Sequence, residues 1–110
     1  MFDTNKFTQE QSDRIRKQYK NRIPIIIWDI GDNIMIKKRK FIVPIDITVG
    51  QFLYVLRKQI TNITEADGIF LFIHGNNAIP LMSELIGIVF NNHNDNGFLK
   101  LTITKENTFG

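Results

Sequence analysis

The stretch IPIIIWDI, residues 23–30, is the clearest indication of the fold of this 110-residue chain. It is rich in β-branched side chains and almost continuously apolar, whereas a strand with one wet face alternates apolar and polar residues. Such a run is typical of a strand that is covered on both faces. Pro24 suits the beginning of a strand, because proline cannot donate a hydrogen bond inside a sheet. We therefore expect residues 23–30 to form a buried central strand.

The residues that follow predict a hairpin and then a helix. A turn at residues 31–33 leads to a second strand at KFIVP, residues 40–44. Thr48 can cap the next helix, and Gln51 three residues later completes a capping box. The helix then carries an apolar stripe with the spacing of one helix face, made of Val49, Phe52, Leu53, Leu56 and Ile60.

Three further elements complete the chain. IFLFI, residues 69–73, is a short apolar strand, and FLKLTIT, residues 98–104, is an alternating last strand. Ser83 can cap a short helix that ends at Phe90. Near the beginning of the chain, a polar helix is predicted from Thr8 or Ser12 to Tyr19.

This order of elements predicts an α+β fold in which a mixed sheet wraps over one helix. If the last strand lies parallel beside the first, residues 23–30 become central, which explains their lack of polar alternation. The topology is that of a ubiquitin-like β-grasp roll with an N-terminal helical extension. We divide the chain into an N-terminal extension (1–22), a ubiquitin-like domain (23–104) and a flexible C-terminal tail (105–110).

Charge and composition restrict the function. The net charge is +3, and nine of the 14 basic residues lie between positions 14 and 40. Such a cluster can bind nucleic acid, anionic lipid or acidic peptide, or it can be a solvated face. The chain has no Cys, which excludes disulfides and thiolate chemistry. It has neither a signal-peptide core nor an apolar run of membrane-spanning length, so we expect a cytoplasmic protein.

Two other classes of function fit the sequence less well. A catalytic domain needs a nucleophile, a base or a metal cluster. His74 and His93 both lie in Asn-rich loops without a pattern of partners, so we interpret them as surface residues and expect no enzyme, metal or cofactor. A nucleic-acid module would combine the basic cluster with exposed aromatic residues. Trp28 lies in a strand, where packing is the better interpretation, and we expect no nucleic-acid partner.

Four segments carry a resemblance to a known family. They are RIRKQYKNRIPIIIWDI, KKRKFIVPIDITVGQFLYVLRKQI, IFLFI and DNGFLKLTITKENTFG. From Ser12 to Gly110 the chain resembles the autophagy-related ubiquitin-like modifiers of the light-chain-three/GABARAP group. The resemblance implies that activating and conjugating enzymes join Gly110 to the amine of phosphatidylethanolamine. The protein would then be cytoplasmic before conjugation and bound to the autophagosomal membrane after it.

The last residues, KENTFG, fit this chemistry. Glycine has no side chain to block a narrow enzyme channel, and its backbone adopts any conformation. Phe109 offers a recognition contact without crowding the reacting carbon. We therefore predict conjugation at Gly110, with an extended tail before it. The alternative that the sequence leaves open is a ubiquitin-like module that docks peptides but is never conjugated.

The resemblance also implies docking of short aromatic-x-x-aliphatic motifs from cargo receptors and adaptors, by a protein that we expect to be a monomer. An edge strand accepts an extended peptide by β-augmentation. Alternation along residues 38–43 predicts that Lys38, Lys40 and Ile42 point one way and that Phe41 and Val43 point the other way.

The resemblance assigns two pockets to this edge. The motif's aromatic side chain would enter a pocket lined by Ile15, Pro24, Lys40, Ile42 and Phe98. Its aliphatic side chain would enter a pocket lined by Phe41, Val43, Pro44, Ile47, Phe52 and Val55, although plain core packing is an alternative for Ile47, Phe52 and Val55. Arg22, Lys38 and Lys40 would attract the acidic residues that flank such motifs.

Overall fold

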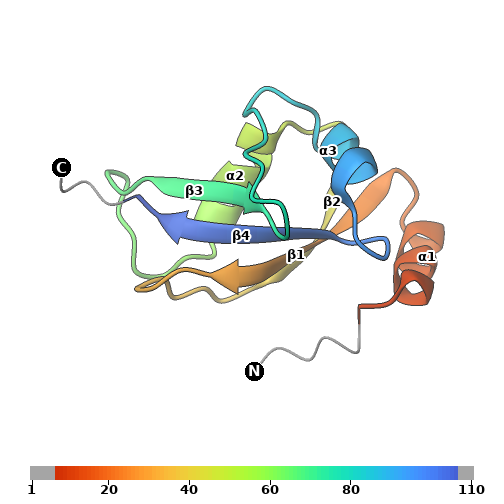
Figure 1. Ribbon diagram of the computed structural model, residues 1–110, viewed down its shortest axis with the longest axis horizontal. Coiled ribbons are helices and arrows are strands. Elements are labelled where there is room, and N and C mark those ends of the chain that lie inside the picture. The colour runs from red at the N-terminus through yellow and green to blue at the C-terminus, as the bar shows by residue number, and fades with distance from the viewer. Residues whose placement is uncertain (1–6, 107–110) are drawn as a thin grey trace.

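The computed structural model describes residues 7–106. In chain order the elements are α1 (Gln9–Gln18), β1 (Arg22–Ile30), β2 (Lys40–Pro44), α2 (Val49–Arg57), β3 (Ile69–Ile73), α3 (Ile86–His93) and β4 (Leu99–Lys105). The strands form a four-stranded sheet in the order β2-β1-β4-β3 (Figure 1). The predicted α+β grasp topology is confirmed, including the N-terminal helix.

Strand β1 lies inside the sheet because it pairs on both sides. It runs antiparallel to β2 and parallel to β4, while β3 runs antiparallel to β4. Pro24 pairs with Ile42 of β2 but comes one residue before Ile25, the first residue of β1 that pairs with β4. The N–H that proline lacks therefore falls outside the β1–β4 ladder.

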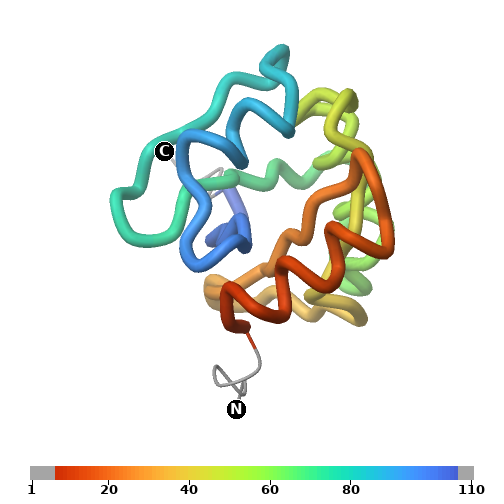
Figure 2. The backbone as a smooth tube through the Cα atoms, turned by 90° about the vertical axis from the view of Figure 1, so that its right-hand side faces the viewer, coloured from red at the N-terminus to blue at the C-terminus, as the bar shows by residue number. Residues whose placement is uncertain are grey.

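Two apolar clusters cover the two faces of β1. Ile23, Ile25 and Ile27 belong to the main core beneath α2. Ile26, which points to the opposite face, belongs to a second cluster with Phe7 and Phe98. Helix α1 lies beside β1 and contributes Ile15 to this second cluster (Figure 2). The unbroken apolar run in β1 therefore reflects burial on both faces, as predicted.

The helix ends differ in how well the sequence predicts them. The capping box between Thr48 and Gln51 is present at the beginning of α2. Thr8 caps α1, with its side chain accepting a hydrogen bond from the N–H of Gln11 at 3.2 Å. A beginning at Ser12 is wrong, because Ser12 lies inside α1 and is buried.

The prediction that Ser83 caps α3 is also wrong. The N-cap is Leu85, and it makes no side-chain hydrogen bond to the helix. Residues 84–87 instead run alongside residues 45–49. The N–H of Val49 donates to Glu84 O at 2.9 Å, and the N–H of Ile86 donates to Ile47 O at 2.8 Å. These tertiary bonds hold Ser83 outside the helix.

Burial on both faces of β1 gives a stability prediction. Ile25→Ala and Ile26→Ala should each lower the free energy of unfolding by about 2–5 kcal/mol, because each leaves a cavity in a packed cluster. Ile79→Ala, at a side chain that is 64% exposed, is the matched control and should change it by less than about 0.5 kcal/mol. Urea unfolding measures all three, and a small effect for Ile26→Ala alone would contradict burial of the second face.

Candidate functional site

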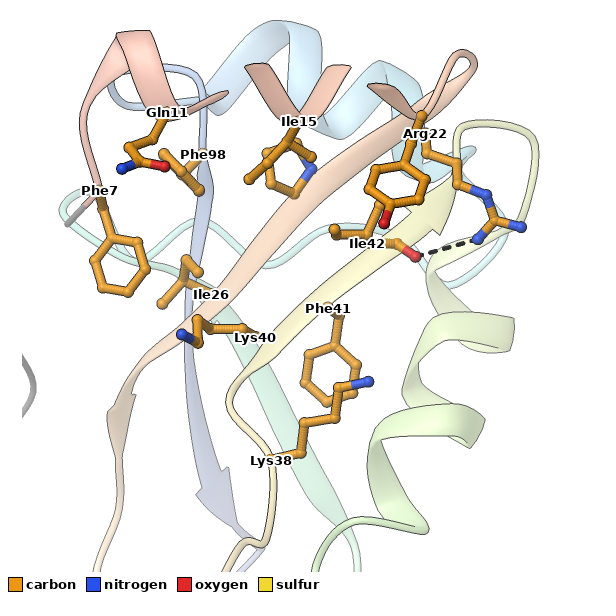
Figure 3. Close-up of a pocket in the computed structure, with 12 residues that line it drawn as sticks. Phe7, Gln11, Ile15, Arg22, Ile26, Lys38, Lys40, Phe41, Ile42 and Phe98 are labelled. Carbon is orange, nitrogen blue, oxygen red and sulfur yellow. Dashed lines mark hydrogen bonds between the residues drawn. The ribbon is translucent and has the colours of Figure 1, made fainter. Parts of the chain in front are cut away.

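A pocket of about 830 Å³ lies between α1, β1 and β2 (Figure 3). It is lined by Phe7, Gln11, Ile15, Tyr19, Arg22, Pro24, Ile26, Lys38, Lys40, Phe41, Ile42 and Phe98. These include every residue assigned to the aromatic pocket, together with the basic residues Arg22 and Lys38. The structure therefore brings together, in one cavity, residues from four separate parts of the sequence.

The floor of the pocket is apolar and firmly packed. Phe98 and Ile26 are both 2% exposed. The ring of Phe7 packs edge-to-face against Phe98, with 5.4 Å between the ring centroids. A floor of this kind can stack against an inserted aromatic ring or apolar side chain, because edge-to-face and offset contacts both suit such rings.

One face of α1 forms a wall of the pocket. Gln11, Ile15 and Tyr19 line the cavity, and they stand at positions i, i+4 and i+8 of the helical spacing. Sequence reasoning included Ile15 but missed Gln11 and Tyr19, although the same spacing identifies all three. It also missed Ile26, which the two-residue period of β1 places on the same face as Pro24.

The basic run KKRK contains residues with different roles. Lys38 and Lys40 are exposed, whereas Arg39 is partly buried and donates to the backbone oxygens of Ile27 and Trp28. Burial of its guanidinium lowers the pKa of Arg39, and the nearby Asp29 carboxylate opposes that shift. Arg39 therefore ties the loop before β2 to β1, and it positions the lysines on either side of it.

The expectation that Lys38 and Lys40 point the same way is wrong. Lys40 points toward Ile26, whereas Lys38 lies beside the ring of Phe41 (Figure 3). The Lys38 ammonium is 5.0 Å from the centroid of that ring. The alternation fails at Lys38 because β2 begins at Lys40, so Lys38 belongs to the preceding loop. Within β2 the alternation holds, with Ile42 exposed and with Phe41 and Val43 buried.

The backbone of β2 presents outward-facing groups to an incoming strand. The N–H of Ile27 donates to Arg39 O at 2.8 Å, which fixes the antiparallel pattern of β1 and β2. In that pattern the N–H and C=O groups of Lys40 and Ile42 point away from β1, toward the outer edge of the sheet. The Arg22 guanidinium donates to Ile42 O at 3.3 Å (Figure 3).

The residues assigned to the aliphatic pocket are less clearly grouped. Of that set, only Phe41 lines the cavity described above. Val43 and Phe52 belong to the main core, where the rings of Phe41 and Phe52 pack edge-to-face at 5.4 Å. Pro44 and Ile47 are half-buried, and Val55 is exposed. An aliphatic pocket at this position remains a prediction.

Features outside the pocket correct one interpretation and support another. His74 has a partner, since its Nδ1 lies 2.8 Å from Asp29 Oδ2. This pair could not be predicted from local sequence patterns, because the two residues are far apart in the chain. Trp28 packs against Phe7, with ring centroids 5.8 Å apart, as expected for a packing role.

Residues 7–106 contain no group of three or more metal-ligating side chains that could hold an ion. No helix in this part of the chain has the length and apolar character that crossing a bilayer requires. Phe109 and Gly110 lie outside the described residues.

Comparison with known proteins places the chain in a family. Residues 7–110 match the family model described as "Autophagy protein Atg8 ubiquitin like". Autophagy-related protein 8 of Dictyostelium discoideum is 42% identical over 105 residues, which cover 93% of this chain and 84% of that protein.

Two solved structures agree. ATG8 of Trypanosoma brucei superposes with a TM-score of 0.80 at 30% identity, covering 93% of this chain and 88% of that one. Plasmodium falciparum Atg8, solved in complex with an Atg3 peptide, superposes with a TM-score of 0.73 at 29% identity. The match covers 86% of this chain and 85% of that one. This chain belongs to the Atg8 family of ubiquitin-like autophagy proteins.

Proposed function

We propose that this protein is a ubiquitin-like modifier that is conjugated through Gly110 to phosphatidylethanolamine on autophagic membranes. We also propose that the pocket beside α1 and the edge strand β2 dock aromatic-x-x-aliphatic motifs of cargo receptors and adaptors. The observation that carries the docking proposal is the apolar pocket with a basic rim beside the outward-facing backbone of β2.

Each part of this site has a separate role in binding. The floor at Phe98 and Ile26 takes the aromatic ring of the motif, because burial of such a ring supplies much of the affinity. The N–H and C=O groups of Lys40 and Ile42 pair with the extended peptide backbone. The ammonium groups of Lys38 and Lys40 attract acidic flanking residues, which speeds association and fixes the register.

Family membership supports the conjugation proposal. The family match extends through Gly110, the residue whose carboxylate would be activated and transferred to the lipid amine. The Plasmodium relative was solved with an Atg3 peptide. This supports a conjugating enzyme as a partner here. We further propose that an activating enzyme acts before it and that Phe109 is a recognition contact. The protein would be cytoplasmic until lipidation places it on the autophagosomal membrane.

The docking proposal predicts the effect of reversing the charge of the rim. Lys38→Glu with Lys40→Glu should weaken binding of an acidic-flanked aromatic-x-x-aliphatic peptide by at least tenfold, about 1.4 kcal/mol. The loss should be smaller in high salt, because ions screen exposed charges. Titration calorimetry at two salt concentrations measures both effects.

Two controls make this result specific. A Lys58→Glu variant changes an exposed lysine outside the pocket and should bind as the unaltered protein does. A peptide whose acidic residues are replaced by serine should lose little affinity for the double variant. Unchanged affinity of the double variant for the acidic peptide would mean that the assigned groove is wrong.

The conjugation proposal predicts the effect of changing Gly110. Deletion of Gly110 should abolish transfer to phosphatidylethanolamine liposomes in a reaction with activating and conjugating enzymes and ATP, because Phe109 would crowd the reacting carbon. Gly110→Ala should slow the transfer strongly. The melting temperature should change by less than about 2 °C, because the core is untouched. If the deletion variant still becomes lipidated in a gel-shift assay, the non-conjugated docking module is the better account.

A further inference from the structure

One face of helix α1 lines the pocket, and another packs against the rest of the protein. Gln11, Ile15 and Tyr19 line the pocket. A different face, with Ser12 and Arg16 at positions i and i+4, holds the helix to the rest of the protein. The Arg16 guanidinium lies 5.0 Å from the centroid of the Phe90 ring in α3. Any shift of the anchoring face therefore moves the pocket wall with it, because both belong to one rigid helix.

The contact at Ser12 is the tightest part of this anchor. Ser12 is fully buried, and its Oγ donates to Gly97 O at 2.6 Å across 85 residues of sequence. Position 97 leaves no room for a side chain. An added Cβ would clash with Ser12 Oγ, and it would lie 2.5 Å from Ser12 Cβ.

The turn that carries Gly97 is itself fixed. Gly97 has a φ of +82°, and its N–H donates to Asn94 Oδ1 at 3.1 Å. The next residue is Phe98, which forms the pocket floor. One short turn thus holds both the floor and, through Ser12, the helix that forms the wall.

We propose that Ser12 and Gly97 are positioning residues that set the width of the pocket between α1 and Phe98. That width decides which aromatic side chain the pocket prefers. The inference rests on the proposed docking function. It adds a determinant of specificity that touches no ligand, because neither residue lines the pocket. The short hydrogen bond between Ser12 and Gly97 O keeps α1 close to Phe98. A small aromatic ring needs this narrow pocket, because it can then contact both sides.

The test uses the full chain and three peptides that differ only in their aromatic residue, which is Trp, Tyr or Phe. Gly97→Ala should push α1 away from the turn and widen the pocket. Affinity for the Phe peptide should fall by about tenfold and that for the Trp peptide by about threefold or less, because a gap beside the smaller ring forfeits more contacts. The measured quantity is the ratio of the two dissociation constants.

A matched control separates pocket width from backbone strain. Gly75 also has a positive φ, +105°, but an added Cβ there has no atom within 4 Å. Gly75→Ala therefore introduces comparable strain in a turn without moving α1. This variant should lower the melting temperature. The ratio of the dissociation constants for the Phe and Trp peptides should stay at the value of the unaltered protein.

A compensating variant makes the test sharper. An alanine Cβ at position 97 would have two Ser12 atoms among its three nearest neighbours, and Ser12→Gly removes both of them. The third is the flexible end of the Gln9 side chain. Ser12→Gly combined with Gly97→Ala should therefore move the ratio of the dissociation constants back toward that of the unaltered protein, because the clash is removed and Arg16 still holds α1 against Phe90. Its melting temperature should stay low, because glycine weakens a helix and the Ser12 hydrogen bond is lost.

The outcomes distinguish this inference from the proposed function. If the unaltered protein binds none of the three peptides, the docking function itself is wrong. If it binds them but Gly97→Ala weakens all three equally, Ser12 and Gly97 serve stability alone and the inference is overturned. The same holds if the ratio of the Phe and Trp dissociation constants follows the melting temperature across the variants.

Discussion

The parallel pairing of β1 with β4 fixes the arrangement of the sheet and of the pocket beside it. Because β4 occupies one side of β1, β2 on the other side becomes the outermost strand at that edge. The register that pairs Ile25 with Leu99 also places Phe98 next to Pro24. An apolar floor and an open strand edge therefore meet at one end of the sheet, and α1 closes the cavity between them (Figure 3).

The same pairing separates the two proposed activities. Phe98 lies at the beginning of β4, and the chain leaves β4 at Lys105, at the other end of the strand. Seven residues at about 3.3 Å each put these ends roughly 23 Å apart. In Figure 1 α1 and the end of the β4 arrow lie on opposite sides of the molecule. The pocket floor and the residue at which the chain leaves β4 therefore lie at opposite ends of that strand.

Most of the fold could be predicted from the sequence, because its strongest signals are local or follow from burial. The apolar run in β1 and the capping box of α2 each reflect one physical cause, and both were confirmed. The beginning of α3 could not be predicted, since tertiary hydrogen bonds outweigh the capping preference of Ser83. The split of KKRK into exposed lysines and a partly buried Arg39 also depends on contacts with β1. The pocket residues came from resemblance, because β1, β2, α1 and Phe98 meet only in three dimensions.

Amide hydrogen exchange, followed residue by residue, shows whether the outer edge of β2 receives an extended peptide, as we propose. In the free protein the N–H groups of Phe41 and Val43 face β1 and should exchange slowly, whereas those of Lys40 and Ile42 face outward and should exchange fast. A saturating aromatic-x-x-aliphatic peptide should slow exchange at Lys40 and Ile42. Unchanged exchange there, with new protection at the β3 edge instead, would contradict this proposal.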